Sequence, residues 1–294
     1  FGRFEIRGAD SLAALARAAS SHLPKVGRVG LVYFDGPTGR FATELSMLRT
    51  GEETATLIGA AVARDHDRDL LTAALGDPAA LEDTTERVYC LLVTGPDARR
   101  ILSPLTDADL TRPWLSVQPA RIADRPAMFA RVSFAGELGW EIHAARDDIL
   151  AIHAALGSVK PFGMWALDSM RIEKGFRAWG TDLSPGYTLP EVGAGRFLRD
   201  PGPDPARRLL PLTLEDIGID ALPMSPVWRG DARVGEVTSA AYGHRIGAPV
   251  ALAMLSAEIS PGDPVEVEVF GRRVPARTHP DAPLFDPAHE RLRA

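Results

Sequence analysis

The stretch "RVSFAGELGWEIH", residues 131–143, places two glutamates and a tryptophan around two glycines, directly after a run that alternates like a β-strand. Gly136 and Gly139 can both adopt positive φ angles. One interpretation is therefore a tight turn between two strands, with Glu137 and Glu141 in solvent. The rest of the chain is needed to show whether these glutamates instead have a chemical role.

Length and composition indicate a globular protein. The 294 residues provide enough apolar material for a large core, and this length suggests two domains. Hydrophobic residues make up 45% and charged residues 24%, which gives no reason to expect extended disorder. A formal charge of -6 argues against nucleic acid as the main partner, because a phosphate backbone selects basic surfaces.

The chain contains one cysteine, Cys90, in the run "RVYCLLVTG", which is typical of a buried strand. A single cysteine excludes an internal disulfide and a cysteine-rich zinc site. No apolar run is long enough to span a membrane, and residues 1–10 lack the charged and apolar regions of a signal peptide. We therefore expect a cytoplasmic protein that does not enter a membrane.

Strand and helix patterns alternate through residues 1–199. Residues 1–8 alternate with period two, and a helical pattern begins near Asp10. Residues 26–50 predict two strands around the turn "DGPTG", and residues 125–145 predict another strand pair. Because hairpins interrupt the strand–helix units, the pattern favours a mixed α+β sheet over a doubly wound parallel one.

The amino-acid composition of the sequence changes at about Asp200. Residues 199–208, "RDPGPDPARR", hold three prolines and a glycine, which is typical of a linker. Short strand-like runs at hairpin spacing follow and predict a small antiparallel β-barrel. We therefore divide the chain into residues 1–199, with two interleaved α+β lobes, a linker at 200–207 and a barrel domain at 208–294.

Common cofactor and metal motifs are absent from the sequence. The chain has no GxGxxG after a first strand and no GxxxxGK[ST], so no dinucleotide or nucleoside triphosphate site is expected. Its seven histidines form no HExxH or HxH pair. His66, in "RDHDRD", is interpreted as part of a solvated, charged helix start, and we expect no metal site.

Besides the opening stretch, two polar blocks have both a structural and a functional interpretation. Glu44, in "GRFATELSM", lies two residues after Ala42 on a strand, so it should face the same side as Ala42 and Ser46. The structural interpretation makes it an outward strand glutamate. Residues 166–185 begin as a helix that must end at or after Gly175, and their charges fit an ordinary exposed helix face.

Six segments together resemble one protein family in their order and approximate spacing. They are "FGRFEIRGAD", "GRFATELSM", "LLVTGPDARRIL", "FAGELGWEIH", "ALDSMRIEKGFRAWGTDL" and "GEVTSAAYG". The chain resembles the folate-binding half of dimethylglycine dehydrogenase and sarcosine dehydrogenase, itself similar to aminomethyltransferase, the T-protein of the glycine cleavage system. The resemblance covers Phe1 to about Arg277. It implies a three-lobed cloverleaf of α+β domains, with a C-terminal β-barrel, around a central hole where tetrahydrofolate binds.

The resemblance also implies roles for individual residues. Phe134 takes the aromatic position that stacks near the folate, and Glu141 that of the glutamate that holds the pterin ring. The second role is chemically reasonable, because a carboxylate can accept two parallel hydrogen bonds from an aminopyrimidine N–H and its exocyclic amine. Glu44 takes the place of the family's catalytic aspartate. The other expected folate contacts are Arg171, Trp179, Glu191 and Tyr242, of which Trp179 and Tyr242 are equally well explained as core or rim residues.

Several of these positions depart from the family pattern. Glu44 extends the aspartate by one methylene, which can displace a catalytic carboxylate by ~1 Å and cost on the order of 100-fold in rate. Leu167 stands where the aminomethyltransferases have a folate-contacting arginine, so Arg171, one turn along, is a candidate substitute. Phe134 replaces the usual tyrosine and loses a hydroxyl. Glu191 aligns only with a one-residue deletion.

The resemblance leads to a preferred function and two alternatives. The preferred function is a tetrahydrofolate-dependent subunit that captures a methylene or formaldehyde unit and forms 5,10-methylenetetrahydrofolate. No flavin motif precedes Phe1, so we expect the unit to come from N-methyl amine oxidation or demethylation by a separate flavin- or metal-dependent oxidase or demethylase subunit. The first alternative is a non-catalytic scaffold subunit of such a complex. The second, a folate-binding protein of iron–sulfur cluster assembly, carries KGCxxGQE where this chain has "KGFRAWGTD".

Overall fold

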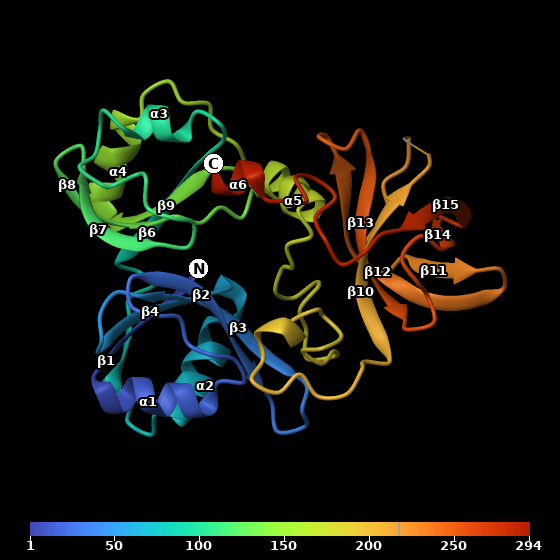
Figure 1. Ribbon diagram of the computed structural model, residues 1–294, viewed down its shortest axis with the longest axis horizontal. Coiled ribbons are helices and arrows are strands. Elements are labelled where there is room, and N and C mark those ends of the chain that lie inside the picture. Colours follow the sequence, from blue (N-terminus) through green and yellow to red (C-terminus); the bar gives the residue numbers. More distant parts are fainter. Residues whose placement is uncertain (217) are drawn as a thin grey trace.

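The computed structural model describes residues 1–216 and 218–294, which form three lobes (Figure 1). Two lobes are built on open sheets and the third is a closed barrel. No helix within the described ranges is both long and apolar enough to cross a membrane. The mixture of helices with antiparallel sheets agrees with the predicted α+β class.

The first lobe is a five-stranded antiparallel sheet in the order β2-β3-β4-β1-β5, with two helices packed together on it (Figure 1). Its elements are β1 (Gly2–Arg7), α1 (Ala9–Ala18), β2 (Arg28–Asp35), β3 (Phe41–Arg49), β4 (Thr54–Gly59), η1 (Ala61–Ala63), α2 (Arg64–Leu75), η2 (Pro78–Ala80) and β5 (Leu81–Asp83). Leu12 of α1, Leu71 of α2 and Leu45 of β3 share one buried apolar cluster. The predicted first strand, first helix and β2–β3 hairpin are confirmed.

The second lobe is a four-stranded antiparallel sheet in the order β6-β9-β8-β7. Its elements are β6 (Val88–Thr94), α3 (Ala98–Leu102), β7 (Val117–Ile122), β8 (Arg125–Ala130), β9 (Gly139–Ala145) and α4 (Arg146–Ala155). Trp140 is buried in its core together with Phe129 and with Ile152 of α4. The strand pair predicted within residues 125–145 is β8–β9, and the opening stretch forms the loop between these strands and β9 itself.

The third lobe is the predicted antiparallel barrel. Its strands are β10 (Arg207–Leu214), β11 (Pro226–Arg229), β12 (Ala232–Gly243), β13 (Ala248–Ser256), β14 (Pro264–Val269) and β15 (Arg272–Thr278). The barrel domain predicted at 208–294 is too long, because residues after Thr278 leave the barrel and α6 (Glu290–Arg293) lies beside the second lobe (Figure 1). In that tail, the backbone N–H groups of Leu284 and Phe285 donate to the carbonyl of Glu173.

Helix α5 (Met164–Glu173) and the segment after it connect the lobes. α5 packs against β12 and ends at Glu173, two residues before the predicted limit at Gly175, which adopts a φ of 68°. Residues 184–198, with η3 (Gly195–Phe197), return to the first lobe, where the Phe41 N–H donates to the carbonyl of Tyr187. The sheets of the first two lobes are therefore consecutive in the sequence, and residues 184–198 join the first lobe after the second lobe is complete.

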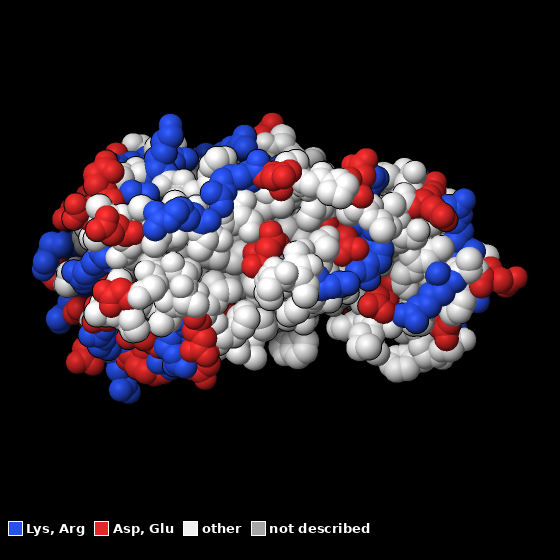
Figure 2. Space-filling view, turned by 90° about the horizontal axis from the view of Figure 1, so that it is seen from below, with Lys and Arg blue, Asp and Glu red and all other residues white. Residues whose placement is uncertain are grey.

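Charges of both signs are distributed over the molecule. Figure 2 shows acidic and basic side chains interspersed on one face, with uncharged residues between them. Many belong to exposed ion pairs, such as Arg68 with Asp65 at 2.8 Å. Pairs of this kind contribute little to folding, because water and salt screen them.

Candidate functional site

The glycines of the opening stretch permit close packing between lobes. Gly136 has a φ of 75°, and a Cβ atom there would lie 2.7 Å from Cγ of Lys174 at the end of α5. A Cβ atom on Gly139 would lie 3.0 Å from side-chain atoms of Ser133 and Thr94. The loop is therefore packed against its neighbours at both glycines, and only Gly136 of the two adopts the positive φ that the sequence allows.

The two glutamates of this stretch have different surroundings. Glu137 is 9% exposed, and its Oε1 lies 3.2 Å from Arg245 and 3.6 Å from Arg291. Arg245 also contacts the buried carboxylate of Glu173, so Glu137 belongs to an ion network between α5, the barrel and the tail. The side chain of Glu141, on β9, keeps 26% exposure. Of the pair, Glu141 has the carboxylate that a ligand can reach.

An aromatic pair forms beside this loop. The rings of Phe134 and Phe176 stack with centroids 6.0 Å apart and planes 15° apart. Phe134 is 36% exposed, and Phe176 follows the glycine that ends α5. Phe176 was considered in the sequence only as a departure from a cysteine, and no local pattern indicates that it meets Phe134.

Glu44 lies opposite Tyr33 in the β2–β3 register, and the two side chains affect each other's pKa. Burial raises the pKa of Glu44 to about 7, while the Tyr33 hydrogen bond and the charge of Arg177 oppose the rise. Burial, then the neighbouring Glu44, raises the pKa of Tyr33. Tyr33 was not among the predicted site residues, although pairing the two hairpin strands across "DGPTG" would have placed it opposite Glu44.

A β-bulge changes the face on which Ala42 lies. The β2–β3 register shifts between Phe34 and Asp35, so Ala42 joins the apolar cluster of Leu45 beneath the helices. The expectation that Ala42 faces the same side as Glu44 is therefore wrong. Glu44 remains partly exposed on the opposite face of the sheet from Leu45.

Arg171 has a different role from the predicted folate contact. Its side chain is 2% exposed. Its guanidinium donates to Asp168 at 2.8 Å, to Ser239 at 2.7 Å, to the Phe176 carbonyl at 3.0 Å and to the fully buried Asp182. Because four acceptors already surround this guanidinium, Arg171 is not available to a ligand.

The Arg171–Asp182 ion pair fixes the segment that carries Trp179. Asp182 also accepts hydrogen bonds from the hydroxyls of Thr238 and Ser239 and from the backbone of Ala178. Trp179 packs against the apolar cluster that includes Tyr33. Its indole nitrogen is buried and has no hydrogen-bond partner within the described ranges.

Glu191 and Tyr242 are engaged elsewhere. The carboxylate of Glu191 is paired with Arg207 at 2.8 Å and accepts a hydrogen bond from the backbone of Thr188. Glu191 therefore ties the returning segment to the first barrel strand. Tyr242, at the end of β12, accepts a hydrogen bond from Ser169 through its carbonyl, and its ring meets the edge of His244.

The predicted solvated helix start around His66 is only partly correct. α2 begins at Arg64, but Asp67 is 1% exposed and neither carboxylate oxygen has a partner in the described part of the chain. Burial raises the pKa of Asp67. His66 itself contacts the carbonyl of Ala42 at 3.2 Å.

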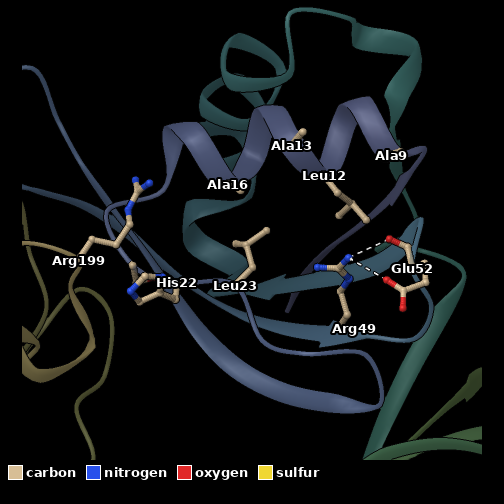
Figure 3. Close-up of a pocket in the computed structure, with 10 residues that line it drawn as sticks. Ala9, Leu12, Ala13, Ala16, His22, Leu23, Arg49, Glu52 and Arg199 are labelled. Carbon is tan, nitrogen blue, oxygen red and sulfur yellow. Dashed lines mark hydrogen bonds and ion pairs between the residues drawn. The ribbon is translucent and has the colours of Figure 1, made fainter.

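A cavity of about 440 Å³ lies beside α1, and none of the residues lining it is a predicted site residue (Figure 3). Apolar side chains, including Leu12 and Leu23, form much of its wall. The guanidinium groups of Arg49 and Arg199 at its rim already donate to backbone carbonyls. We therefore assign no ligand to this cavity.

The chain is similar to known protein families and to a solved structure. The family model described as "GCVT N-terminal domain" matches residues 1–200, and "Glycine cleavage T-protein C-terminal barrel domain" matches residues 207–286. Glycine cleavage system aminomethyltransferase T from Bartonella henselae has a similar crystal structure, with a TM-score of 0.81 and 21% identity, covering 97% of this chain and 84% of that one. This similarity confirms the predicted fold.

Three curated relatives show the range of similar proteins. Mitochondrial dimethylglycine dehydrogenase of Rattus norvegicus is 31% identical over 94% of this chain and 36% of its own length. An aminomethyltransferase of Thermus thermophilus is 32% identical over 95% of this chain and 83% of its own. The 4-methylaminobutanoate oxidase (formaldehyde-forming) of Paenarthrobacter nicotinovorans is 30% identical over 100% and 39%. The chain thus spans a little over a third of the dehydrogenase and the oxidase.

Proposed function

Because the chain belongs to the glycine cleavage T-protein (aminomethyltransferase) family, we propose that it transfers a one-carbon unit to tetrahydrofolate. The aminomethyltransferases of this family are transferases, and their fold is the one adopted here. The one-carbon unit is a methylene or formaldehyde group released from an N-methyl amine, and the product is 5,10-methylenetetrahydrofolate. Glu44 is the observation that carries this proposal, because its carboxylate is partly exposed on the sheet face opposite the helices, across from Tyr33, and its raised pKa of about 7 suits proton transfer.

Glu141 and Phe134 are proposed to hold the pterin ring. The Glu141 carboxylate is partly exposed and can accept hydrogen bonds from the aminopyrimidine N–H and its exocyclic amine. The exposed part of the Phe134 ring can stack on a flat heterocycle while Phe176 supports it from behind. Tetrahydrofolate supplies the nitrogen nucleophile that accepts the one-carbon unit.

Glu44 is proposed to manage the proton of this reaction. When ionised, its carboxylate can accept a proton released at the reacting nitrogen and can stabilise a nearby positive charge. The hydroxyl of Tyr33 donates to the same carboxylate and favours its ionised form. Glu44→Gln should therefore slow transfer while leaving tetrahydrofolate affinity almost unchanged.

The source of the one-carbon unit is proposed to be a separate flavin- or metal-dependent oxidase or demethylase. Large apolar side chains are exposed just before and within the start of α5: Phe162 at 40%, Met164 at 73% and Trp165 at 90%. Clustered exposed apolar side chains are typical of a protein contact surface. A complex purified through a tag on this chain should carry a flavin or metal and oxidise N-methyl amines. Trp165→Ser should weaken the complex, so that the oxidase activity no longer purifies with this chain. Phe270→Ser, on the barrel, should leave the complex intact.

A scaffold subunit without activity is the second candidate. The observation in its favour is Arg171, whose guanidinium is fully occupied within the protein and leaves α5 without that cation for a folate carboxylate. In this case the fold would be retained for assembly, and tetrahydrofolate would not bind.

Calorimetry of tetrahydrofolate with the full chain separates the two candidates. The wild-type chain should bind, and Glu141→Ala should weaken binding by ~1.5–3 kcal/mol, because a hydrogen bond to a charged group is lost. Glu53→Gln, at an exposed glutamate after β3, is the matched control and should bind like the wild type. Absence of binding by a folded wild-type chain would overturn the transferase proposal and leave the scaffold.

A further inference from the structure

Cys90, Glu141 and His143 lie together where β6 pairs with β9. Glu141 and His143 are two residues apart on β9 and share a face, and Cys90 is the register partner of His143 on β6. One potential ligand atom from each residue lies within 4.8 Å of the others, which is the spacing of a metal site. The His143 side chain is 2% exposed, and its Nε2 has no well-aligned hydrogen-bond partner among the described residues.

Arg3 determines the hydrogen-bonding state of His143. Nη1 of Arg3, on β1 of the first lobe, lies 3.0 Å from Nδ1 of His143. A guanidinium can only donate, so Nδ1 must be the acceptor and the ring hydrogen must be on Nε2. Nε2 lies 3.3 Å from Oε2 of Glu141, so the two groups are in contact, although the N–H direction is not well aligned with that oxygen.

The same arrangement argues against a metal ion. Binding through Nε2 needs a free lone pair there, which would move the hydrogen to Nδ1 and against the Arg3 guanidinium. The positive charge of Arg3 also repels a cation at this distance. Burial, together with the charge of Glu141, raises the pKa of Cys90, so the sulfur is a neutral thiol in the absence of a metal ion.

We propose that Arg3 and His143 are positioning residues that orient the Glu141 carboxylate toward the pterin ring. Arg3 belongs to the sheet that carries Glu44, and Glu141 belongs to the second lobe. The Arg3–His143–Glu141 triad therefore connects the two lobes. It fixes the position of the Glu141 carboxylate relative to the sheet that carries Glu44. The inference rests on the proposed function for its ligand, but the hydrogen-bond order of the triad does not.

The first test is nuclear magnetic resonance of the full chain with ¹⁵N-labelled histidine. The expected result is a neutral His143 ring with the hydrogen on Nε2. In Arg3→Met, this tautomer should no longer be favoured over the one with the hydrogen on Nδ1. A hydrogen on Nδ1, or a doubly protonated ring at neutral pH, would overturn the triad. A shift of the Nε2 resonance upon addition of equimolar Zn²⁺, lost in Cys90→Ala, would also overturn it in favour of a metal site.

The second test uses two histidine variants that differ in where they can donate. The amide nitrogen of His143→Gln reaches the place of Nε2 and should keep near wild-type tetrahydrofolate affinity. His143→Asn reaches only the place of Nδ1 and should weaken binding by about 5- to 10-fold, the value of one hydrogen bond. His153→Gln, at an exposed histidine of α4, is the matched control. Equal losses in the Gln and Asn variants would contradict a donor role for His143.

A failure of the proposed function can be told from a failure of the triad. If the wild-type chain does not bind tetrahydrofolate, the transferase proposal falls and, with it, the pterin as the ligand of Glu141. The ¹³C carboxyl resonance of Glu141 then still reports on the triad. It should move in His143→Asn and stay in place in His143→Gln, and the absence of this difference would overturn the triad.

Discussion

Tyr33 lies directly opposite Glu44 across the β2–β3 pair, and its hydroxyl lowers the pKa of the Glu44 carboxyl group. Glu44 lies on the face of the sheet opposite its helices, and Tyr33 belongs to an apolar cluster against which Trp179 packs. Burial makes the carboxyl group a weak acid, and the hydroxyl partly offsets this effect. A carboxyl group with a pKa of about 7 changes its charge in the range where proton-transferring groups are most effective.

The rate of one-carbon transfer should depend on the ionisation of Glu44. The rate should rise as the pH increases through about 7, because the ionised carboxylate is the form that accepts a proton. In Glu44→Gln the rate should be lower by about 100-fold or more and should lose this inflection. The measurement is the pH profile of product formation from formaldehyde and tetrahydrofolate, corrected for the uncatalysed reaction. An unchanged profile in the variant would exclude Glu44 as the group responsible.

Folding stability should also depend on Glu44, with the opposite trend. Between its ordinary pKa of 4.5 and the raised value of about 7, folded Glu44 keeps a proton that the unfolded chain has lost. The free energy of unfolding therefore falls as pH rises through this window, by at most about 3 kcal/mol. Above this window, Glu44 adds no further pH dependence. Urea unfolding of wild type and Glu44→Gln at several pH values measures the difference. If the two curves run parallel, the pKa of Glu44 is not raised in the folded chain.

Stacking should make Phe134 a measurable part of the ligand site. Phe134→Ala should weaken tetrahydrofolate binding by about 5- to 10-fold, because aromatic stacking contributes on the order of 1 kcal/mol. Phe134→Tyr should bind at least as well as the wild type, since the ring is retained. Phe270→Ala removes a ring that is 88% exposed on the barrel and serves as the calorimetric control. Equal affinity of Phe134→Ala and wild type would remove Phe134 from the site.

Arg171 should matter for stability rather than for ligand contact. Arg171→Met leaves the fully buried Asp182 without its cation, so the free energy of unfolding should fall by about 3–5 kcal/mol. Arg171→Met/Asp182→Asn should recover part of this loss because no uncompensated charge remains. Arg68→Met, in an exposed pair, should cost less than about 1 kcal/mol in the same urea titration. A stable Arg171→Met with lost tetrahydrofolate binding would restore the ligand role.

The two glutamates of the opening stretch should separate in function. Glu137→Gln weakens the contact with Arg245, so it should lower the free energy of unfolding by about 1–3 kcal/mol and leave tetrahydrofolate affinity unchanged. Glu141→Gln should show the reverse. Denaturant unfolding and calorimetry on both variants form the comparison. Loss of binding in a fully stable Glu137→Gln would mean that the roles of the two residues have been exchanged.

Much of the fold could be predicted because local patterns specify it. Period-two alternation marks β1, the glycine–proline turn marks the β2–β3 hairpin, and Gly175 marks the end of α5. The barrel follows from short strands after a proline-rich linker. The boundary at which the tail leaves the barrel could not be predicted, because it depends on contacts with α5 rather than on a local signal.

The site could be predicted only in part. A motif indicates Phe134, Glu141 and Glu44, but it does not show which further residues meet them. Tyr33 could have been predicted by pairing the two hairpin strands, which places it opposite Glu44. Phe176 and Arg3 could not, because they come from other elements of the chain. The sequence suggested that Arg171 was available to a ligand, because no local pattern shows that Asp182 and Ser239 bind its guanidinium.

The sequence by itself determined where the chain forms strands, helices and tight turns, because these depend on residues close together along it. It also placed a carboxylate at each of the two functional positions. Only the tertiary structure decided which charged groups remain available to a ligand. Glu137 is occupied by Arg245 and Arg171 by Asp168, Asp182 and Ser239, whereas Glu141 keeps an exposed edge and Glu44 has a raised pKa. Burial and ion pairing depend on residues that are distant in sequence, and only folding brings them together.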